Sequence, residues 1–415
     1  MSSQILIPIL FIVFCWLIYQ ASKRQPERFS FSEVLTILGV RVLLGFLYGY
    51  IFAKYFNGDD TWYFHKGSIE EQAKLLSNPL QFLADFNPYP AFQRNESWSA
   101  GWYYYLSDLE FWLLTKPMAI FNLITNGNYY ANVVCFNFLL CWGSIWLFRF
   151  FNNTYPNRRR LVFFSVFILP VPLFWMTGIR AEGWLLLFIA GALLSFERLT
   201  DRIKLGNLLW FLASIIGILI LRSMLLFLLL PTMLCWWIQV KKGWRPWKPL
   251  ALVFGLGLLV FFGSTLLDAN ANLPNIIIKR QAAFFALNGQ TRIPLDTLSN
   301  QPQSFLKIFP QAVGNSFVRP FIWEAKGWLQ VISSFSTMFL LVLIFAFFIR
   351  PRNSYTQLYA QPASFYPAVF AVLLYLFIGY TIPFPGAIIR YKSIGEWFLV
   401  VPLILSIRWK NTIKL

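Results

Sequence analysis

The chain has 415 residues, of which 58% are hydrophobic and only 13% are charged, and its mean hydropathy is +0.57. A soluble domain carries about 25% charged residues, so this composition excludes an ordinary soluble protein. The formal net charge of +18 at pH 7 invites a nucleic-acid ligand, but the distribution of the basic residues indicates membrane topology instead.

Eleven apolar segments are long enough to predict membrane-spanning helices, near 4–20, 33–54, 129–150, 161–177, 182–196, 206–221, 224–240, 249–267, 328–349, 364–382 and 396–407. Their apolar runs are continuous and not alternating, which favours helices over a barrel. We therefore expect an all-α polytopic transmembrane bundle that forms a single integral membrane domain over residues 1–415. The aromatic region 103–125 predicts interfacial helices and not a further span.

The connections between these segments differ in their basic content, which predicts the orientation of the chain. One set carries 18 basic and three acidic residues, whereas the other carries 15 basic and 13 acidic residues. The first set is expected to face the cytoplasm, with the N-terminus outside and the C-terminus inside. The positive charge of this set is then explained by membrane topology and by contact with anionic membrane lipid. No nucleic-acid partner is therefore expected. Its basic residues are Lys23, Arg24, Arg28, Arg158, Arg159, Arg160, Arg198, Arg202, Lys204, Lys241, Lys242, Arg245, Lys248, Arg350, Arg352, Arg408, Lys410 and Lys414.

The external face is expected to carry two large loops, at about 57–128 and 268–327. Each contains an amphipathic piece that suits the membrane surface, at Ile69–Phe82 and Ile276–Leu287. Shorter external turns are expected at Thr177–Gly183, Leu221–Ser223 and Pro383–Glu396.

An acid pair begins the first large loop. Asp59 and Asp60 follow an apolar segment that ends near Phe56, and His65, the only histidine, comes shortly after them. Carboxylates are costly at the mouth of a membrane helix, so the pair indicates a functional site. A solvated helix cap would also explain the two acids, and a structural or interfacial role would explain His65.

The remaining unusual charged residues also fall on the expected external side. They are Arg180, Glu182, Arg222, Arg319, Glu324, Arg390 and Lys392. Arginine binds phosphate through a planar fork and keeps its charge when partly desolvated, so together they predict guanidinium groups around a carboxylate pair. Local ion pairs, helix starts and snorkelling to head groups are the structural alternatives.

Such a site would suit a lipid-linked phosphate at the membrane boundary. A carboxylate of Asp59 or Asp60 would act as general base on an acceptor hydroxyl while a sugar is displaced from its phosphate. The same two acids would otherwise hold a divalent cation such as Mg²⁺ or Mn²⁺, although two carboxylates alone do not complete a coordination sphere. No cofactor is certain on this reasoning.

With these residues, the chain resembles the GT-C superfamily of integral-membrane glycosyltransferases that use polyprenyl-phosphate sugars. In that family an acidic motif opens the first large external loop, and Asp59-Asp60 matches it in type and place. The resemblance implies that these acids are the base or hold a metal, and that Arg180, Arg222, Arg319 and Arg390 bind the lipid phosphate. The elements Trp175–Glu182 and Gly386–Lys392 also look like parts of bacterial envelope proteins of this type. Here the motif follows the second predicted span and not the first, and Glu182 or Glu324 would supply the family's later acid.

The sequence therefore predicts a glycosyltransferase of the bacterial inner membrane, active in cell-envelope glycan biosynthesis. It would transfer a sugar from a polyprenyl-phosphate donor to a lipid, glycan or protein acceptor on the external face. Two alternatives stay open: an O-antigen-type polymerase or ligase that acts on polyprenyl-diphosphate glycans, and a flippase or transporter for lipid-linked sugars. The acid pair favours the first function over a polymerase or ligase, which would not require it. A transporter would carry polar residues through the bilayer centre on several helices, whereas charges within the predicted spans are nearly absent, with Arg41 the main exception.

Overall fold

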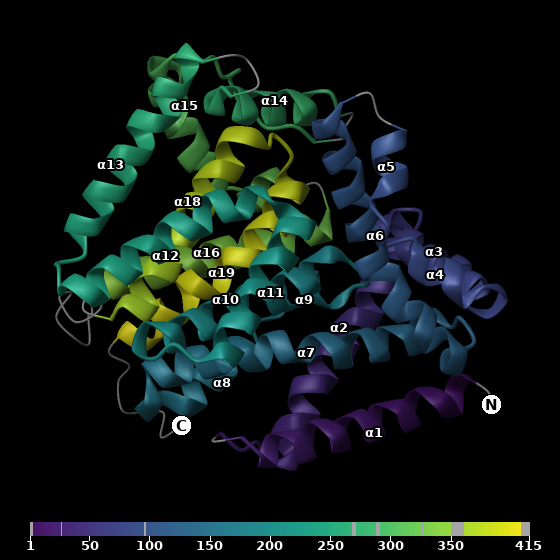
Figure 1. Cartoon of the computed structure of the whole chain (residues 1–415). Coiled ribbons are helices and arrows are strands. Elements are labelled where there is room, and N and C mark those ends of the chain that lie inside the picture. Colours follow the sequence, from purple (N-terminus) through teal and green to yellow (C-terminus); the bar gives the residue numbers. More distant parts are fainter. Residues whose placement is uncertain are drawn as a thin grey trace. The chain divides into compact units, whose positions relative to one another are not determined.

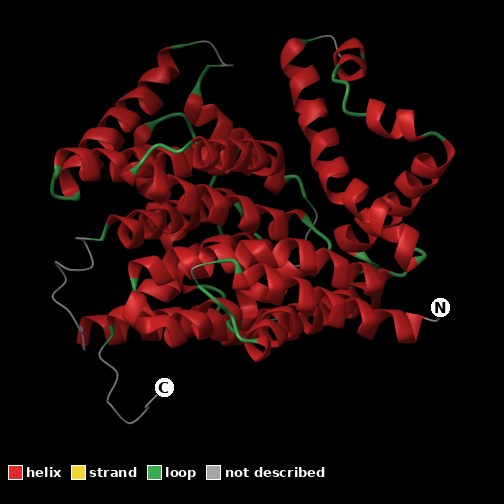
Figure 2. Ribbon diagram, turned by 60° about the horizontal axis from the view of Figure 1, so that its bottom comes forward, coloured by secondary structure: helices red, strands yellow, loops and turns green. Residues whose placement is uncertain are grey.

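The structure is a computed structural model, and it describes residues 3–25, 27–94, 97–267, 271–287, 291–325, 327–349 and 361–407. These residues form helices and loops without a strand (Figure 2). The predicted all-α bundle is therefore confirmed. Arg350, Arg352, Arg408, Lys410 and Lys414 of the predicted cytoplasmic set lie outside the described residues.

The chain contacts divide it into two compact units. The first comprises Met1–Phe150 and Phe167–Ser223, and the second comprises Phe151–Val166 and Met224–Leu415. Helix α7 continues from the first unit into the second, and α8 lies almost wholly in the second.

The helices of the first unit, labelled in Figure 1, are α1 (Ser3–Lys23), α2 (Phe31–Tyr55), α3 (Asp59–Ser77), α4 (Pro79–Ala84), α5 (Tyr89–Gln93), α6 (Trp98–Thr125), α7 (Tyr129–Thr154), α9 (Pro170–Thr177), α10 (Ala181–Asp201) and α11 (Leu205–Arg222). Those of the second unit are α8 (Arg159–Phe167), α12 (Met224–Lys242), α13 (Trp247–Gly263), α14 (Leu273–Phe285), α15 (Pro302–Val313), α16 (Trp328–Ile349), α18 (Pro362–Thr381) and α19 (Pro385–Ser406).

Nine helices in the described part of the chain are long and apolar enough to cross a membrane. The bent pair Pro156–Phe167 and Pro170–Thr177 would make a tenth span, so ten of the eleven predicted segments have a counterpart. The eleventh, 396–407, is the second half of α19, whose first half carries Arg390 and Lys392. The protein is thus a multi-pass membrane protein, and the orientation of its termini stays a prediction.

Three sequence expectations about the connections were wrong. Region 103–125 belongs to a single 28-residue helix, α6, and not to several short ones, although α6 is, as expected, not among the candidate spans of the described residues. The range Pro383–Glu396 is mostly helix, because α19 begins at Pro385. The amphipathic piece expected at Ile69–Phe82 is divided between α3 and α4, since Pro79 starts a new helix after Asn78.

Buried ion pairs hold α3 against α4 and α6. The Lys116 ammonium of α6 donates to Glu71 Oε2 at 2.6 Å and to Asp85 Oδ2 at 2.9 Å, and Lys74 pairs with the same two acids. The Lys116 ammonium also lies 3.9 Å from the ring centroid of Phe82. Two positive and two negative side chains thus balance within the first large loop, which fixes the direction of α3.

Helix α2 is the central element of the first unit, and its ends and faces follow from its sequence. It begins with a capping box in which the Ser30 hydroxyl accepts from the Glu33 amide while the Glu33 carboxylate accepts from the Ser30 amide. Gly45 and Gly49 lie one turn apart on the face toward α7. A Cβ at Gly45 would lie 2.6 Å from Val133 and 2.9 Å from the Thr177 carbonyl oxygen, so only glycine permits this approach.

We predict that Gly45→Ala lowers the free energy of unfolding by about 1–2 kcal/mol, because overpacking outweighs the helix propensity that alanine adds. The matched control is Gly255→Ala in α13, where a Cβ meets nothing within 4 Å. The control should be neutral or slightly stabilising in the same SDS titration of mixed micelles. Equal stability of the two variants would contradict the close packing of α2.

Candidate functional site

The two acids of the predicted motif open helix α3. Gly58 is the residue before the helix, and Asp59 and Asp60 occupy its first turn, where the helix dipole favours negative charge. The chain reaches this point through three consecutive residues with positive φ: Asn57 (51°), Gly58 (92°) and Asp59 (45°). Glycine adopts this conformation freely, but Asn57 and Asp59 are strained in it, and such strain is concentrated at functional sites.

Arg180 lies in the short break between α9 and α10, and its side chain is only 1% exposed. Its Nη1 donates to Asp59 Oδ2 at 3.0 Å and to the Tyr48 hydroxyl at 2.7 Å, and its Nη2 donates to Asp60 Oδ2. The Nε atom lies 3.5 Å from Glu182 Oε2, an ion-pair contact without a hydrogen bond. The structure thus brings Asp59, Asp60, Arg180 and Glu182 together, as the sequence predicted.

The balance of charge differs from the expected one. In the first unit three carboxylates surround one guanidinium, whereas the sequence predicted several guanidinium groups around two carboxylates. Burial by itself lowers the pKa of Arg180, but Tyr48, Glu182, Asp60 and Asp59 together raise it more, so the net direction is upward. Arg180 therefore stays charged and fixes the acids, and its fork is already occupied by them.

The two aspartates are much more accessible than the arginine that holds them. The Asp59 side chain is 36% exposed and that of Asp60 is 47% exposed, while that of Glu182 is 1% exposed. Each aspartate binds Arg180 through Oδ2. Among the described residues, Asp59 Oδ1 has no hydrogen-bond donor. A second molecule therefore has access to an oriented carboxylate oxygen.

The break that holds Arg180 is itself supported by neighbouring helices. Arg41, near the middle of α2, donates from Nη2 to the Met176 carbonyl at 3.2 Å and from Nη1 to Ser144 at 2.9 Å. Asn137 of α7 donates to the Thr177 carbonyl at 2.9 Å. These donors satisfy the last carbonyls of α9, which would otherwise be unpaired inside the protein. This role of Arg41 and Asn137 could not be predicted from the sequence, because each carbonyl group lies in a segment distant from its donor.

Aromatic residues pack beside the acids at the start of α3. Thr61 shares a 2.8 Å hydrogen bond with the Tyr129 hydroxyl, and the Trp62 ring stacks on the Tyr129 ring at 3.9 Å. The Trp62 indole donates to the Gly49 carbonyl at 3.1 Å. Thr61 and Trp62 follow the acid pair directly, so their position in the sequence could have indicated that they lie at the site. Tyr129 lies 69 residues beyond Asp60, and nothing in the sequence indicates its contact with them.

His65 lies in a buried polar network one turn further along α3. Asn132 Nδ2 lies 3.3 Å from His65 Nδ1 and also donates to Asn122 Oδ1 at 2.5 Å, and Asn122 donates to Ser68 at 3.0 Å. Burial lowers the pKa of His65 to about 4, and a hydrogen bond with the Gly127 backbone opposes this in part. The imidazole is therefore neutral at pH 7, so it offers no positive charge to a phosphate.

Arg222 is the last residue of α11, and it pairs with an acid that the sequence analysis did not consider. Its Nη1 donates to Glu110 Oε1 of α6 at 2.7 Å, and the two side chains are 25% and 22% exposed. A lone arginine in a very short external turn was the reason to select it. The ion pair with Glu110 compensates the charge of Arg222 at this position.

The other candidate residues belong to the second unit. Arg319 pairs with Glu324 at 3.2 Å, and its Nη1 donates to Asn315 at 3.2 Å. The Arg390 guanidinium lies over the Tyr391 ring. Lys392 is buried, with Nζ 3.4 Å from Thr337 Oγ1, which is a long hydrogen bond. The expected meeting of all these residues in one cavity stays a prediction.

Glu396, one turn after Lys392 on α19, was not among the candidate residues. Glu396 is buried, and its carboxylate accepts a hydrogen bond from Ser336 of α16. It was assigned to the end of an external turn, because the charged first half of α19 does not resemble a membrane helix. Its regular spacing from Lys392 was the signal for a shared helix face.

Asp59 and Asp60 could also bind a divalent cation. In the described part of the chain, no group of three or more His, Cys, Asp or Glu side chains is arranged to hold a metal ion. Asp59 and Asp60 would supply two carboxylates, with the remaining ligands from substrate or water.

Comparison with known proteins identifies no relative of this chain. No family model matches the chain, and neither a curated protein nor a solved structure gives a significant match.

Removing the buried guanidinium should destabilise the first unit. We predict that Arg180→Met lowers the free energy of unfolding by about 2–3 kcal/mol, less than the ~3–5 kcal/mol of a fully buried pair because both aspartates are partly solvated. Adding Glu182→Gln to Arg180→Met should restore part of the loss, since it removes a buried negative charge that the guanidinium no longer compensates. The control Arg222→Met should cost less than about 1 kcal/mol, because its pair is partly exposed. SDS titration in mixed micelles measures all three, and equal losses for Arg180→Met and Arg222→Met would contradict this account.

The lowered pKa of His65 predicts a pH-dependent stability. The unfolded chain binds a proton near pH 6.5, whereas the folded protein does so only near pH 4, so stability is lost as pH falls between these values. The expected contribution between pH 7 and pH 5 is about 2 kcal/mol. His65→Gln keeps a neutral polar side chain and should make the profile flatter over that interval. An unchanged profile would show that His65 is not buried as described.

Proposed function

We propose that this protein is a membrane glycosyltransferase that moves a sugar from a polyprenyl-phosphate donor to a lipid, glycan or protein acceptor on the external face of the inner membrane. One observation carries the proposal: two partly exposed carboxylates are fixed by a buried guanidinium at the ends of apolar helices. A carboxylate in this position suits removal of a proton from an acceptor hydroxyl next to the membrane.

Asp59 is the residue that we assign as general base. Arg180 holds its Oδ2, while Oδ1 has no donor among the described residues and its side chain is 36% exposed. The strained φ of 45° at Asp59 also indicates that this orientation is imposed by the surrounding structure. Asp60 would assist by completing the contact with Arg180.

In this proposal Arg180 positions the carboxylates and does not bind the donor phosphate. Its two terminal nitrogens already donate to Asp59 and Asp60, and a third acid, Glu182, lies beside Nε. Within the first unit the remaining candidate for phosphate recognition is Arg222, whose ion pair with Glu110 is partly exposed. The excess of negative charge around Arg180 also favours a cation at the site, and Mg²⁺ or Mn²⁺ at Asp59 and Asp60 is the alternative to a base.

A lipid-linked sugar flippase or transporter is the second candidate, and one finding favours it. The sequence suggested that charges within the spans are almost absent apart from Arg41. The structure has buried charges at Arg41, Lys392 and Glu396, and buried ionisable groups within membrane proteins often mark a transport pathway. A polymerase or ligase would use the arginines without requiring the acid pair.

We predict that Asp59→Asn lowers sugar transfer by about 10²–10⁴-fold, the usual contribution of a general base, without loss of expression. Asp60→Asn should reduce transfer less, because Asp60 acts through Arg180. The assay uses purified full-length protein, a radiolabelled polyprenyl-phosphate sugar and an acceptor lipid extract. Asp108→Asn on α6 is the matched control, since it removes an exposed carboxylate of the same loop, and it should retain full activity.

The same variants separate the candidate functions. Full activity of both Asp59→Asn and Asp60→Asn would refute the base assignment and favour a polymerase or ligase. Movement of the labelled lipid across proteoliposomes, with no transfer by the unmodified protein, would support the transporter. Restoration of transfer by added Mn²⁺ after treatment with a chelator would assign the acids to a metal.

A further inference from the structure

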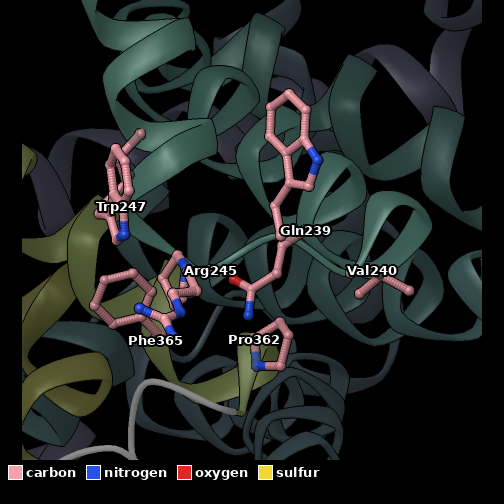
Figure 3. A pocket seen from close by; sticks show the side chains of 10 residues that line it. Gln239, Val240, Arg245, Trp247, Pro362 and Phe365 are labelled. Carbon is pink, nitrogen blue, oxygen red and sulfur yellow. The ribbon is translucent and has the colours of Figure 1, made fainter.

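A pocket in the second unit lies at the turn between α12 and α13, and none of the candidate site residues lines it. Its volume is about 900 Å³, and its walls come from the end of α12, the turn and the start of α13, together with the first turn of α18. Figure 3 shows Gln239 and Arg245 extending toward Pro362 and Phe365 at this pocket. This volume suits a small molecule or part of a lipid.

The position of the turn places the pocket at a membrane surface. Both α12 and the segment Trp247–Leu266 are apolar enough to span a membrane, and only four residues separate Lys242 from Trp247. The turn is tight because Gly243 adopts a φ of 63°, which other residues rarely do. Trp244 and Trp247 are both exposed at the turn, as expected for tryptophans that lie among lipid head groups.

The charged side chains in the segments that line the pocket are all basic. Lys241, Lys242, Arg245 and Lys248 surround the turn, and no acidic residue occurs between positions 224 and 267 or between 361 and 367. Arg245 is exposed, and its guanidinium makes no hydrogen bond or ion pair within the described residues. A guanidinium with no internal partner at this level is free to bind a phosphate.

A second polar group faces the same space. Gln239 is only 9% exposed, and its Oε1 accepts a hydrogen bond from the Tyr366 hydroxyl at 2.7 Å. This contact fixes the amide, so its Nε2 group, which has no acceptor among the described residues, can donate to a ligand in the pocket. An amide N–H group without an internal partner is satisfied when a ligand or water accepts from it.

The apolar part of the wall suits hydrocarbon. Val240, Leu250 and Phe365 line the pocket beside the polar pair, and α13 is mostly exposed along its length. A molecule with an anionic head and apolar tails would therefore match both parts of the wall. A soluble phosphate would leave the apolar part uncovered, and a neutral lipid would leave Arg245 unpaired.

We propose that this pocket binds one anionic glycerophospholipid. The phosphate lies between the Arg245 guanidinium and the Gln239 amide, and the first part of an acyl chain lies against Val240 and Phe365. The predicted orientation puts the turn on the cytoplasmic face, where anionic lipids are exposed to basic residues. The inference does not depend on the proposed transferase activity.

The test uses the full-length protein in a neutral detergent with dansyl-labelled dioleoylphosphatidylglycerol as the probe, detected by energy transfer from tryptophan. Unlabelled dioleoylphosphatidylglycerol should displace the probe, whereas dioleoylphosphatidylcholine and glycerol 3-phosphate should do so at least tenfold less well. Equal displacement by phosphatidylcholine would overturn the role of charge. Equal displacement by glycerol 3-phosphate would overturn the assignment to a lipid.

Two variants locate the binding site. Arg245→Gln should weaken binding of the probe about fivefold, the effect of one basic contact with an anionic lipid. Arg202→Gln is the matched control, because Arg202 is also exposed in a short connection between two candidate spans and lies outside the pocket. Phe365→Ala should reduce the preference for phosphatidylglycerol with long acyl chains over a short-chain form. Equal weakening by Arg245→Gln and Arg202→Gln would show only diffuse attraction and would overturn the proposal.

Discussion

The buried break between α9 and α10 is the constraint on which the first unit depends. A helix that ends inside a membrane protein leaves carbonyl groups that water cannot reach, so the surrounding helices must supply donors. Arg41 and Asn137 supply them, from α2 and α7. Gly45 allows α2 to approach the Thr177 carbonyl closely enough for this arrangement. The break then leaves Arg180 extended, with its guanidinium directed at the first turn of α3.

Arg180 connects the break between α9 and α10 to the acid pair at the start of α3. A buried guanidinium is favourable only when anionic partners compensate for its lost hydration, and here three carboxylates do so. Two of these carboxylates, those of Asp59 and Asp60, are partly exposed. The ion pairs that compensate for the burial of Arg180 therefore also orient two groups that are in contact with solvent. The same interaction thus contributes to stability and holds carboxylate oxygens accessible to solvent at the start of α3. The strained turn at Asn57–Asp59 is consistent with an orientation that the fold imposes.

The second unit shows why buried charge is hard to recognise in a membrane sequence. Lys392 and Glu396 interrupt the apolar pattern of α19, and an interrupted pattern predicts a loop. Their neighbours Thr337 and Ser336 come from α16, which is distant in sequence. The hydroxyl groups that accommodate these charges are therefore visible only when the helices are packed together.

The sequence by itself determined the class of the protein and most of its spans, and it pointed to Asp59, Asp60, Arg180 and Glu182, which the structure brings together. Continuous apolar runs require helices in a bilayer, and charges at helix ends are expensive enough to be noticed in a single segment. Only the tertiary structure decided the balance of charge at the site, the pairing of Arg222 with Glu110 and the burial of His65. Those features depend on which side chains meet from distant helices, and hydropathy and spacing report a residue's own segment but not its partners.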